Sequence, residues 1–160
     1  MICVSNDLYD SCLANGVNSG RCVLIENAID TQQFSRSMDV TSAKQKLGFD
    51  PDRYLIGAVG RLSSEKRFDL LVRAVSALRN DGKDVSLAIV GEGDQRPVLE
   101  RLIAELGLQN HVRLLGFRSD TIDLFQAFDL YALSSIREGL PNVVLEAMAM
   151  GVPVVATAIA

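Results

Sequence analysis

The sequence predicts an α/β fold in which an open parallel β-sheet carries helices on both faces. From residue 54 onward, short apolar segments of strand length alternate with amphipathic segments of helix length. The apolar segments are nearly unbroken, as in Val85–Val90, which is typical of strands buried on both faces. Glycine follows several of these segments, where a strand would turn into a helix.

The sequence before residue 54 is more weakly patterned. Residues 1–37 hold too few predicted elements to bury an independent core. Residues 38–52 are expected to form a linker, which ends near the turn signal Pro51-Asp52. The elements predicted here are strands over 2–4 and 22–25 and helical segments over 7–15 and 43–47.

Residues 53–160 are expected to form one α/β domain. In its first helix, Phe68, Leu71 and Val75 recur at helical spacing, which predicts one buried face. Pro141 suits the first turn of the last helix, and Gly151 suits the residue after its end. The expected strands are 55–59, Val85–Val90, 112–115, Leu130–Leu133 and Val154–Ala156, and the expected helices are 66–79, 94–106, Thr121–Ala127 and 141–150.

Composition excludes several classes of protein. The 160 residues carry a net charge of −4 without a long basic run, which argues against a nucleic-acid-binding surface. The N-terminus lacks the pattern of a signal peptide, and the longest uncharged run, residues 147–160, is too short to span a bilayer. We therefore expect a cytoplasmic protein.

Cysteine and histidine give no sign of a metal site. Cys3, Cys12 and Cys22 form no C-x-x-C motif, and we expect reduced thiols that act as small hydrophobic side chains rather than a disulfide or zinc site. His111 is the only histidine and is expected to be structural.

Ligands of open parallel sheets bind beyond the carboxyl ends of the strands. In this sequence that edge consists of five loops, which cover residues 60–65, 91–94, 116–120, 134–140 and the chain from 157 onward. The candidate functional residues lie in or next to these loops.

Two acids flank the start of the last helix. Glu138 lies in the loop before it, and Glu146 is the only charge in a helix that looks apolar on every face and therefore buried. A buried carboxylate needs a partner, which is either a neighbouring protein group or a hydroxylated ligand. The helix rises about 7.5 Å from Pro141 to Glu146. An extended ligand could thus touch Glu138, the positive end of the helix and Glu146 in turn.

Cations follow the first strand of the domain. Arg61 and Lys66 could clamp an anion at the ligand edge, because arginine suits phosphate. The alternative is that they are solvated, with Lys66 paired to Asp69 across one helical turn. We favour the clamp.

Two glycine motifs are weaker signals. Gly91-Glu92-Gly93 is not a dinucleotide fingerprint, because Arg96 occupies the third glycine position, and it is equally consistent with a tight turn and with ligand contact. Gly116 precedes Phe117 and Arg118. We expect Phe117 to be a core residue, and Arg118 is either a solvated charge or a base contact.

Together these segments resemble retaining glycosyltransferases of family 4, whose two-domain fold is called GT-B. The matching segments are GRLSSEKRFDLLVRA, IVGEGDQRPVLE, VRLLGF and EGLPNVVLEAMAMGVPVVAT, the last being the E-x7-E motif of that family. NAID, at residues 27–30, is similar to the hinge sequence of the family. The resemblance implies that residues 53–160 are the Rossmann-like C-terminal half of a GT-B fold.

The resemblance also implies a donor site for a nucleoside-diphosphate sugar, most often a UDP-sugar, with no metal or other cofactor. Arg61 and Lys66 would hold the diphosphate. Glu138 would be the catalytic acid group at the sugar. The remaining donor-binding residues would be Gly91, Gly116, Phe117, Gly139, Leu140, Asn142 and Glu146, with Glu146 at the ribose and the backbone of residues 116–117 at the base.

By the same resemblance, residues 1–37 would be a remnant of the acceptor domain and hinge, and Ala158 stands where the family usually has Asp. We therefore expect a fragment that supplies the donor-binding half of the enzyme. The acceptor would be a saccharide or a lipid-linked sugar, with peripheral membrane association through the other half. A non-catalytic nucleotide-sugar-binding module and a sugar-nucleotide epimerase of the same architecture are the alternatives.

Overall fold

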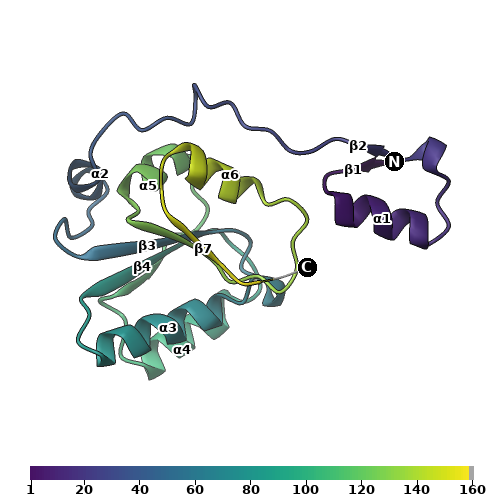
Figure 1. Ribbon diagram of the computed structural model, residues 1–160. Coiled ribbons are helices and arrows are strands. Elements are labelled where there is room, and N and C mark those ends of the chain that lie inside the picture. Colours follow the sequence, from purple (N-terminus) through teal and green to yellow (C-terminus); the bar gives the residue numbers. More distant parts are fainter. Residues whose placement is uncertain (159–160) are drawn as a thin grey trace.

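The computed structural model describes residues 1–158 and contains the predicted parallel sheet (Figure 1). All strand pairs of the five-stranded sheet are parallel, in the order β5-β4-β3-β6-β7. Its elements are β3 (Tyr54–Val59), α3 (Phe68–Asn80), β4 (Val85–Val90), α4 (Arg96–Glu105), β5 (Val112–Leu114), α5 (Thr121–Ala127), β6 (Leu130–Leu133), α6 (Asn142–Ala149) and β7 (Val154–Ala156).

Helices cover both faces of the sheet, as the alternating pattern predicts. Helices α3 and α4 pack on one face, while α5, α6 and α2 (Val40–Lys46) lie on the other (Figure 1). Each face has its own apolar core: Phe68, Val72 and Leu102 belong to one, and Phe125 and Phe128 belong to the other.

The packing against β3 explains one glycine. A Cβ on Gly57 would lie 2.1 Å from the ring of Phe128, so only glycine lets this ring pack directly on the central strand. Phe128 also meets Phe125 edge to face, with ring centroids 5.7 Å apart.

Four predicted elements coincide with the structure: β4, α5, β6 and β7. The start of α3 was predicted two residues too early. Arg67 has a left-handed backbone, with φ at 49°, and therefore ends the short 3-10 turn Ser64–Lys66 before α3 begins at Phe68. Lys66 is thus not in the first turn of α3.

The expectation that α6 is buried on every face is wrong. Ala147 is its only buried residue, and Met148 is 63% exposed. The ends of α6 are close to prediction, because Pro141 is its N-cap and Gly151 adopts φ 67° after its last turn.

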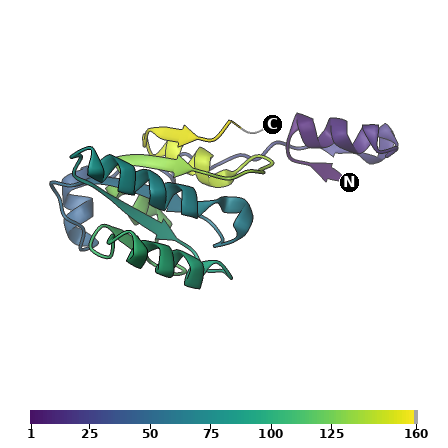
Figure 2. The ribbon, with the colours of Figure 1, turned by 90° about the horizontal axis from the view of Figure 1, so that it is seen from below.

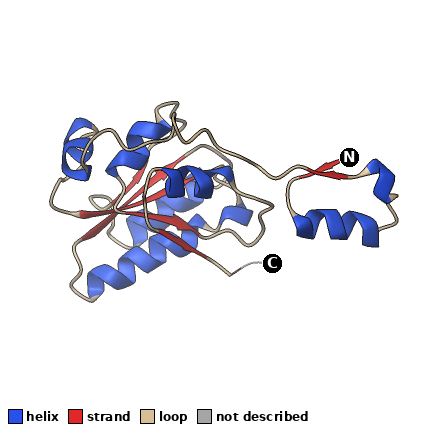
Figure 3. Cartoon of the chain, turned by 45° about the horizontal axis from the view of Figure 1, so that its top comes forward, coloured by secondary structure: helices blue, strands red, loops and turns tan. Residues whose placement is uncertain are grey.

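A small unit lies beside the sheet domain (Figures 1 and 2). It contains β1 (Ile2–Cys3), α1 (Asn6–Ala14), a 3-10 turn over Ser19–Arg21 and β2 (Val23–Leu24), which pairs in parallel with β1. We call residues 25–39, which join this unit to α2, the strap (Figure 3).

The strap is fixed to the sheet domain through Gln126 on α5. Its buried Oε1 atom accepts hydrogen bonds from the backbone N–H groups of Ser37 and Met38 and from the Ser37 hydroxyl, each at 2.9 Å. Arg36 donates to the carbonyl oxygen of Met150 at 3.2 Å.

The stretch expected to be a linker, residues 38–52, contains α2, which packs on α5. Lys44 of α2 is buried and forms an ion pair with Asp129 at 2.6 Å. Asp129 also accepts a hydrogen bond from the backbone N–H of Leu55 at 2.6 Å, which ties α2 to the start of β3. Within residues 1–158, every helix is too short or too polar to serve as a membrane-spanning segment.

Candidate functional site

The site lies where the strand order reverses. From β3 the chain moves outward to β4 and β5, and it then returns to the other side of β3 as β6 and β7. The loops after β3 and β6 therefore leave the same edge of the sheet in opposite directions, and ligands of open parallel sheets bind at such a point. These loops carry Arg61, Lys66 and Glu138.

An ion pair joins the two loops. Lys66 Nζ lies 2.5 Å from Glu138 Oε1, and the Ser135 hydroxyl donates to the same oxygen at 2.6 Å. The Ser134 hydroxyl donates to the backbone oxygen of Lys66 at 2.7 Å. Both charged side chains are mostly shielded from solvent, which strengthens their attraction. The predicted alternative in which Lys66 pairs with Asp69 is wrong, since Arg67 occupies that carboxylate at 3.0 Å.

Beside this pair, a hollow of about 370 Å³ opens at the ends of β3 and β4. Arg61 is exposed at its margin and forms no ion pair within the described residues. Phe117 is 80% exposed and also lines the hollow, so the interpretation of Phe117 as a core residue is wrong. The other lining residues are Val59, Gly60, Val90, Gly91, Glu92, Arg118 and Thr121.

Backbone segments approach each other closely at this edge of the sheet, and the glycine at position 91 makes this close approach possible. Gly91 donates its N–H to Gly116 O at 2.8 Å, and its φ is 137°. A Cβ on Gly91 would lie 1.9 Å from the backbone oxygen of Gly60. The turn interpretation therefore accounts for this glycine by itself, although Gly91 also borders the hollow.

Glu146 has no protein partner. Within residues 1–158 its carboxylate forms neither an ion pair nor a hydrogen bond, and burial raises its pKa. Burial also raises the pKa of the Tyr131 hydroxyl, and the charges of Glu138 and Glu146 both add to that effect. The two acids therefore act on one hydroxyl, that of Tyr131 in β6, which donates to Val59 O at 3.3 Å. The structural ion pair considered for Glu146 is not formed.

The start of α6 lies between the two acids. Gly139 and Leu140 precede Pro141, and Asn142 is the exposed first residue of the helix. No side chain caps this end. The N–H of Val144 donates to Pro141 O at 3.1 Å, whereas those of Asn142 and Val143 have no hydrogen-bond partner within residues 1–158 and could meet an anion. Leu140 is held from the strap side, because Asn27 Nδ2 donates to its backbone oxygen at 2.7 Å.

Sequence reasoning missed the hydroxyl groups that support Glu138. Ser134 and Ser135 are buried, with 2% and 1% exposure, and Thr157 Oγ1 donates to Ser135 O at 2.5 Å. The sequence feature that could have identified these groups is the pair of adjacent serines directly after an apolar strand. Residues 159–160 of the fifth predicted loop lie outside the described residues.

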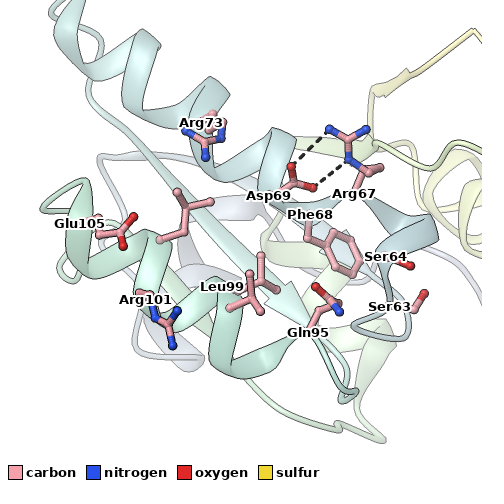
Figure 4. Close-up of a pocket in the computed structure, with 12 residues that line it drawn as sticks. Ser63, Ser64, Arg67, Phe68, Asp69, Arg73, Gln95, Leu99, Arg101 and Glu105 are labelled. Carbon is pink, nitrogen blue, oxygen red and sulfur yellow. Dashed lines mark hydrogen bonds and ion pairs between the residues drawn. The ribbon is translucent and has the colours of Figure 1, made fainter.

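A second hollow, of about 380 Å³, lies between α3 and α4, on the face of the sheet that these two helices cover (Figure 4). Its polar groups include Arg73, Arg101 and the Arg67–Asp69 pair, above an apolar floor that includes Leu99. It contains none of the predicted site residues. His111 precedes β5 and is thus at the opposite edge from Glu138.

The chain belongs to the family described as glycosyl transferases group 1, whose model matches residues 39–160. The α/β architecture with its parallel sheet is that of GT-B glycosyltransferases of known structure. In a complex of Anabaena HepE with UDP-glucose, the similarity covers 97% of this chain and 43% of HepE, with 31% identity and a TM-score of 0.86.

Two curated relatives illustrate the reactions for which proteins similar to this chain are named. The lipopolysaccharide core biosynthesis mannosyltransferase LpsB of Rhizobium meliloti is 34% identical over 139 residues, which is 84% of this chain and 40% of LpsB. A Campylobacter jejuni enzyme that is named as an N-acetylgalactosaminyltransferase acting on a diphospho-undecaprenol-linked sugar is 33% identical over 142 residues, or 88% of this chain and 36% of that enzyme. The chain therefore spans about two-fifths of the length of these relatives.

Proposed function

We propose that this chain supplies the donor-binding half of a retaining glycosyltransferase of family 4. The reaction would transfer a hexosyl group from a nucleoside-diphosphate sugar to a saccharide or lipid-linked acceptor. The E-x7-E motif supports the retaining class by resemblance. Support for a UDP-sugar comes from HepE, a relative solved with UDP-glucose, and support for the acceptor class comes from the names of LpsB and the Campylobacter enzyme.

The geometry suggests one orientation for the donor. The base would enter the hollow beside Gly116 and Phe117, and the diphosphate would meet Arg61, Lys66 and the free N–H groups at the start of α6. Glu138 would then face the sugar, held in place by Lys66 and Ser135. No metal is required in this arrangement, because the lysine, the arginine and the helix end supply the positive charge.

The observation that carries the proposal is the unpartnered carboxylate of Glu146. Shielding a carboxylate without a hydrogen-bond donor is unfavourable, and the raised pKa of Glu146 reflects this. Ribose hydroxyls would supply the absent donors. Glu146 is only partly buried, so in the free protein water rather than a protein group donates to its carboxylate, and a ligand that donates to it directly gains affinity and specificity.

Titration calorimetry with UDP, ADP and GDP in the presence of a chelator tests the proposal. We expect UDP to bind, and Glu146→Gln to weaken binding by about tenfold or more, since a hydrogen bond to a charged group contributes about 1.5–3 kcal/mol. Glu105→Gln, which alters an exposed carboxylate on α4, is the matched control and should bind as the parent does. Absence of binding by all three nucleotides, or equal affinities in both variants, would refute the proposed site.

A further inference from the structure

The small N-terminal unit brings three thiols together. Cys3 lies in β1, Cys12 in α1, and Cys22 directly before β2. Their sulfur atoms all lie within 4.8 Å of one another, and those of Cys3 and Cys12 are 3.9 Å apart. Cys3 and Cys22 are buried, whereas Cys12 is partly exposed, so the cluster is open to solvent on one side.

Two of these three cysteines are the only buried residues of the unit. Among residues 1–25, Cys3 and Cys22 are the only buried residues, and the larger apolar side chains Ile2, Leu8 and Val23 are exposed. All three cysteines are free, so their thiols are available as ligands.

We propose that Cys3, Cys12 and Cys22 bind one thiophilic metal ion of the Zn²⁺ class, which would join β1, α1 and β2. Metal–sulfur bonds of about 2.3 Å place neighbouring thiolates about 3.8–4.0 Å apart in tetrahedral or trigonal geometry. The Cys3–Cys12 spacing already matches this value. The third thiol is close enough to be brought in by side-chain rotation.

The surroundings of the cluster favour a soft ion over a hard one. Met1 Sδ lies 3.3 Å from Cys12 Sγ and offers a thioether as a fourth soft donor. Sulfur donors select zinc-like ions over magnesium or calcium, which prefer oxygen. On binding, the three thiols would release their protons to solvent, and no redox change is involved.

Cadmium provides a direct probe, because thiolate coordination to Cd²⁺ gives an ultraviolet charge-transfer band. The full chain of residues 1–160, kept reduced, is titrated with Cd²⁺ and followed by absorbance and by native mass spectrometry. We expect one ion per chain, displacement by Zn²⁺, and slower hydrogen exchange in residues 1–25 when the metal is bound. UDP binding should be unchanged, which separates this site from the donor site.

Cys12→Ser is the diagnostic variant, because Cys12 is the cysteine that is partly exposed and its replacement disturbs the interior least. We expect its metal affinity to fall by more than about 100-fold, beyond the 10–100-fold typical of outer-shell changes. Asp10→Asn removes an exposed carboxylate from the same helix and keeps all thiols, so it should bind as the parent does. Absence of the band, a stoichiometry other than one, or an unchanged affinity in Cys12→Ser would overturn the proposal. Protection of the main sheet against hydrogen exchange, together with UDP binding, shows whether each variant is folded.

Discussion

Lys66 and Glu138 are 72 residues apart in the chain, and their side chains form an ion pair between the loops after β3 and β6. Because the two loops leave the sheet in opposite directions, this pair spans the point where the strand order reverses. The residue that we propose to hold the diphosphate is therefore bonded to the residue that we propose to face the sugar.

Removing Lys66 should affect both stability and ligand binding. Lys66→Met leaves the shielded Glu138 with only Ser135 as a donor, and we expect a loss of about 1–3 kcal/mol of unfolding free energy. UDP affinity should fall as well. Lys83→Met, at an exposed lysine after α3, is the matched control and should change neither quantity. Denaturant unfolding of the Lys66→Met/Glu138→Gln double variant measures the coupling, and strictly additive effects would contradict an energetic link.

Glu146 should make the stability of the free protein depend on pH. Its pKa in the folded chain is raised above the ordinary value of 4.5, so the protonated form is the one that folding favours. Its contribution is fully present below pH 4.5 and is lost as pH rises through the folded pKa. Relative to Glu146→Gln, the parent should therefore become less stable across this window.

Thermal unfolding of the parent and of Glu146→Gln, measured without nucleotide at a series of pH values, checks this prediction. The difference between the two melting temperatures should change in the window directly above pH 4.5 and then level off. Glu105→Gln serves as the control for replacing an acid by its amide. A difference that is independent of pH would show that Glu146 is well solvated in the folded chain.

Gly91 should tolerate a side chain less well than Gly82. Both have positive φ, but a Cβ at Gly82 would meet nothing within 4 Å, whereas one at Gly91 would lie 1.9 Å from Gly60 O. We expect Gly82→Ala to cost about 1–2 kcal/mol from left-handed strain alone. Gly91→Ala should cost about 1–3 kcal/mol more, because its φ of 137° is less accessible to alanine than 76° and because the end of β3 must move away. Urea unfolding gives both values, and equal costs would mean that this edge of the sheet is readily deformed.

The strap should detach when Gln126 is truncated. Gln126→Ala leaves the N–H groups of Ser37 and Met38 without their acceptor, at a cost of about 1–3 kcal/mol. Hydrogen exchange over residues 31–38 should accelerate, while UDP affinity is kept. Gln33→Ala, at an exposed position on the strap, should leave exchange unchanged. Retained protection in Gln126→Ala would show that the apolar side chains of the strap suffice to hold it.

Donor binding by residues 1–160 should not be accompanied by efficient sugar transfer. Positioning of two reactants can supply about 7–11 kcal/mol of barrier reduction, and in two-domain enzymes the acceptor side of the cleft provides part of it. We expect slow hydrolysis of UDP-glucose at most, detected by release of UDP and glucose. Rapid transfer to a saccharide or lipid-linked acceptor would show that the described half is sufficient.

The sheet could be predicted because its strands are short apolar runs that differ sharply from their flanks, and β4 and β6 were located to the residue. The start of α3 could not, because the left-handed backbone of Arg67 leaves no trace in the apolar pattern. For α6, composition showed that most residues are apolar but not which faces are covered, so the exposure of Met148 was missed. The site residues were selected from their loops, but the Lys66–Glu138 pair depends on tertiary structure that brings distant loops together.

The hydrogen bond from Asn27 to Leu140 O gives the strap a mechanical role, because it joins residues 113 positions apart. A Cβ added to Gly139 would lie 3.4 Å from a methyl carbon of Val4, so the loop before α6 lies close to the N-terminal unit. A displacement of Asn27 must either break this hydrogen bond or move Leu140 with it. Glu138 is two residues from Leu140. A displacement of the strap at Asn27 would therefore reach the acid that we propose to lie at the sugar end of the donor site.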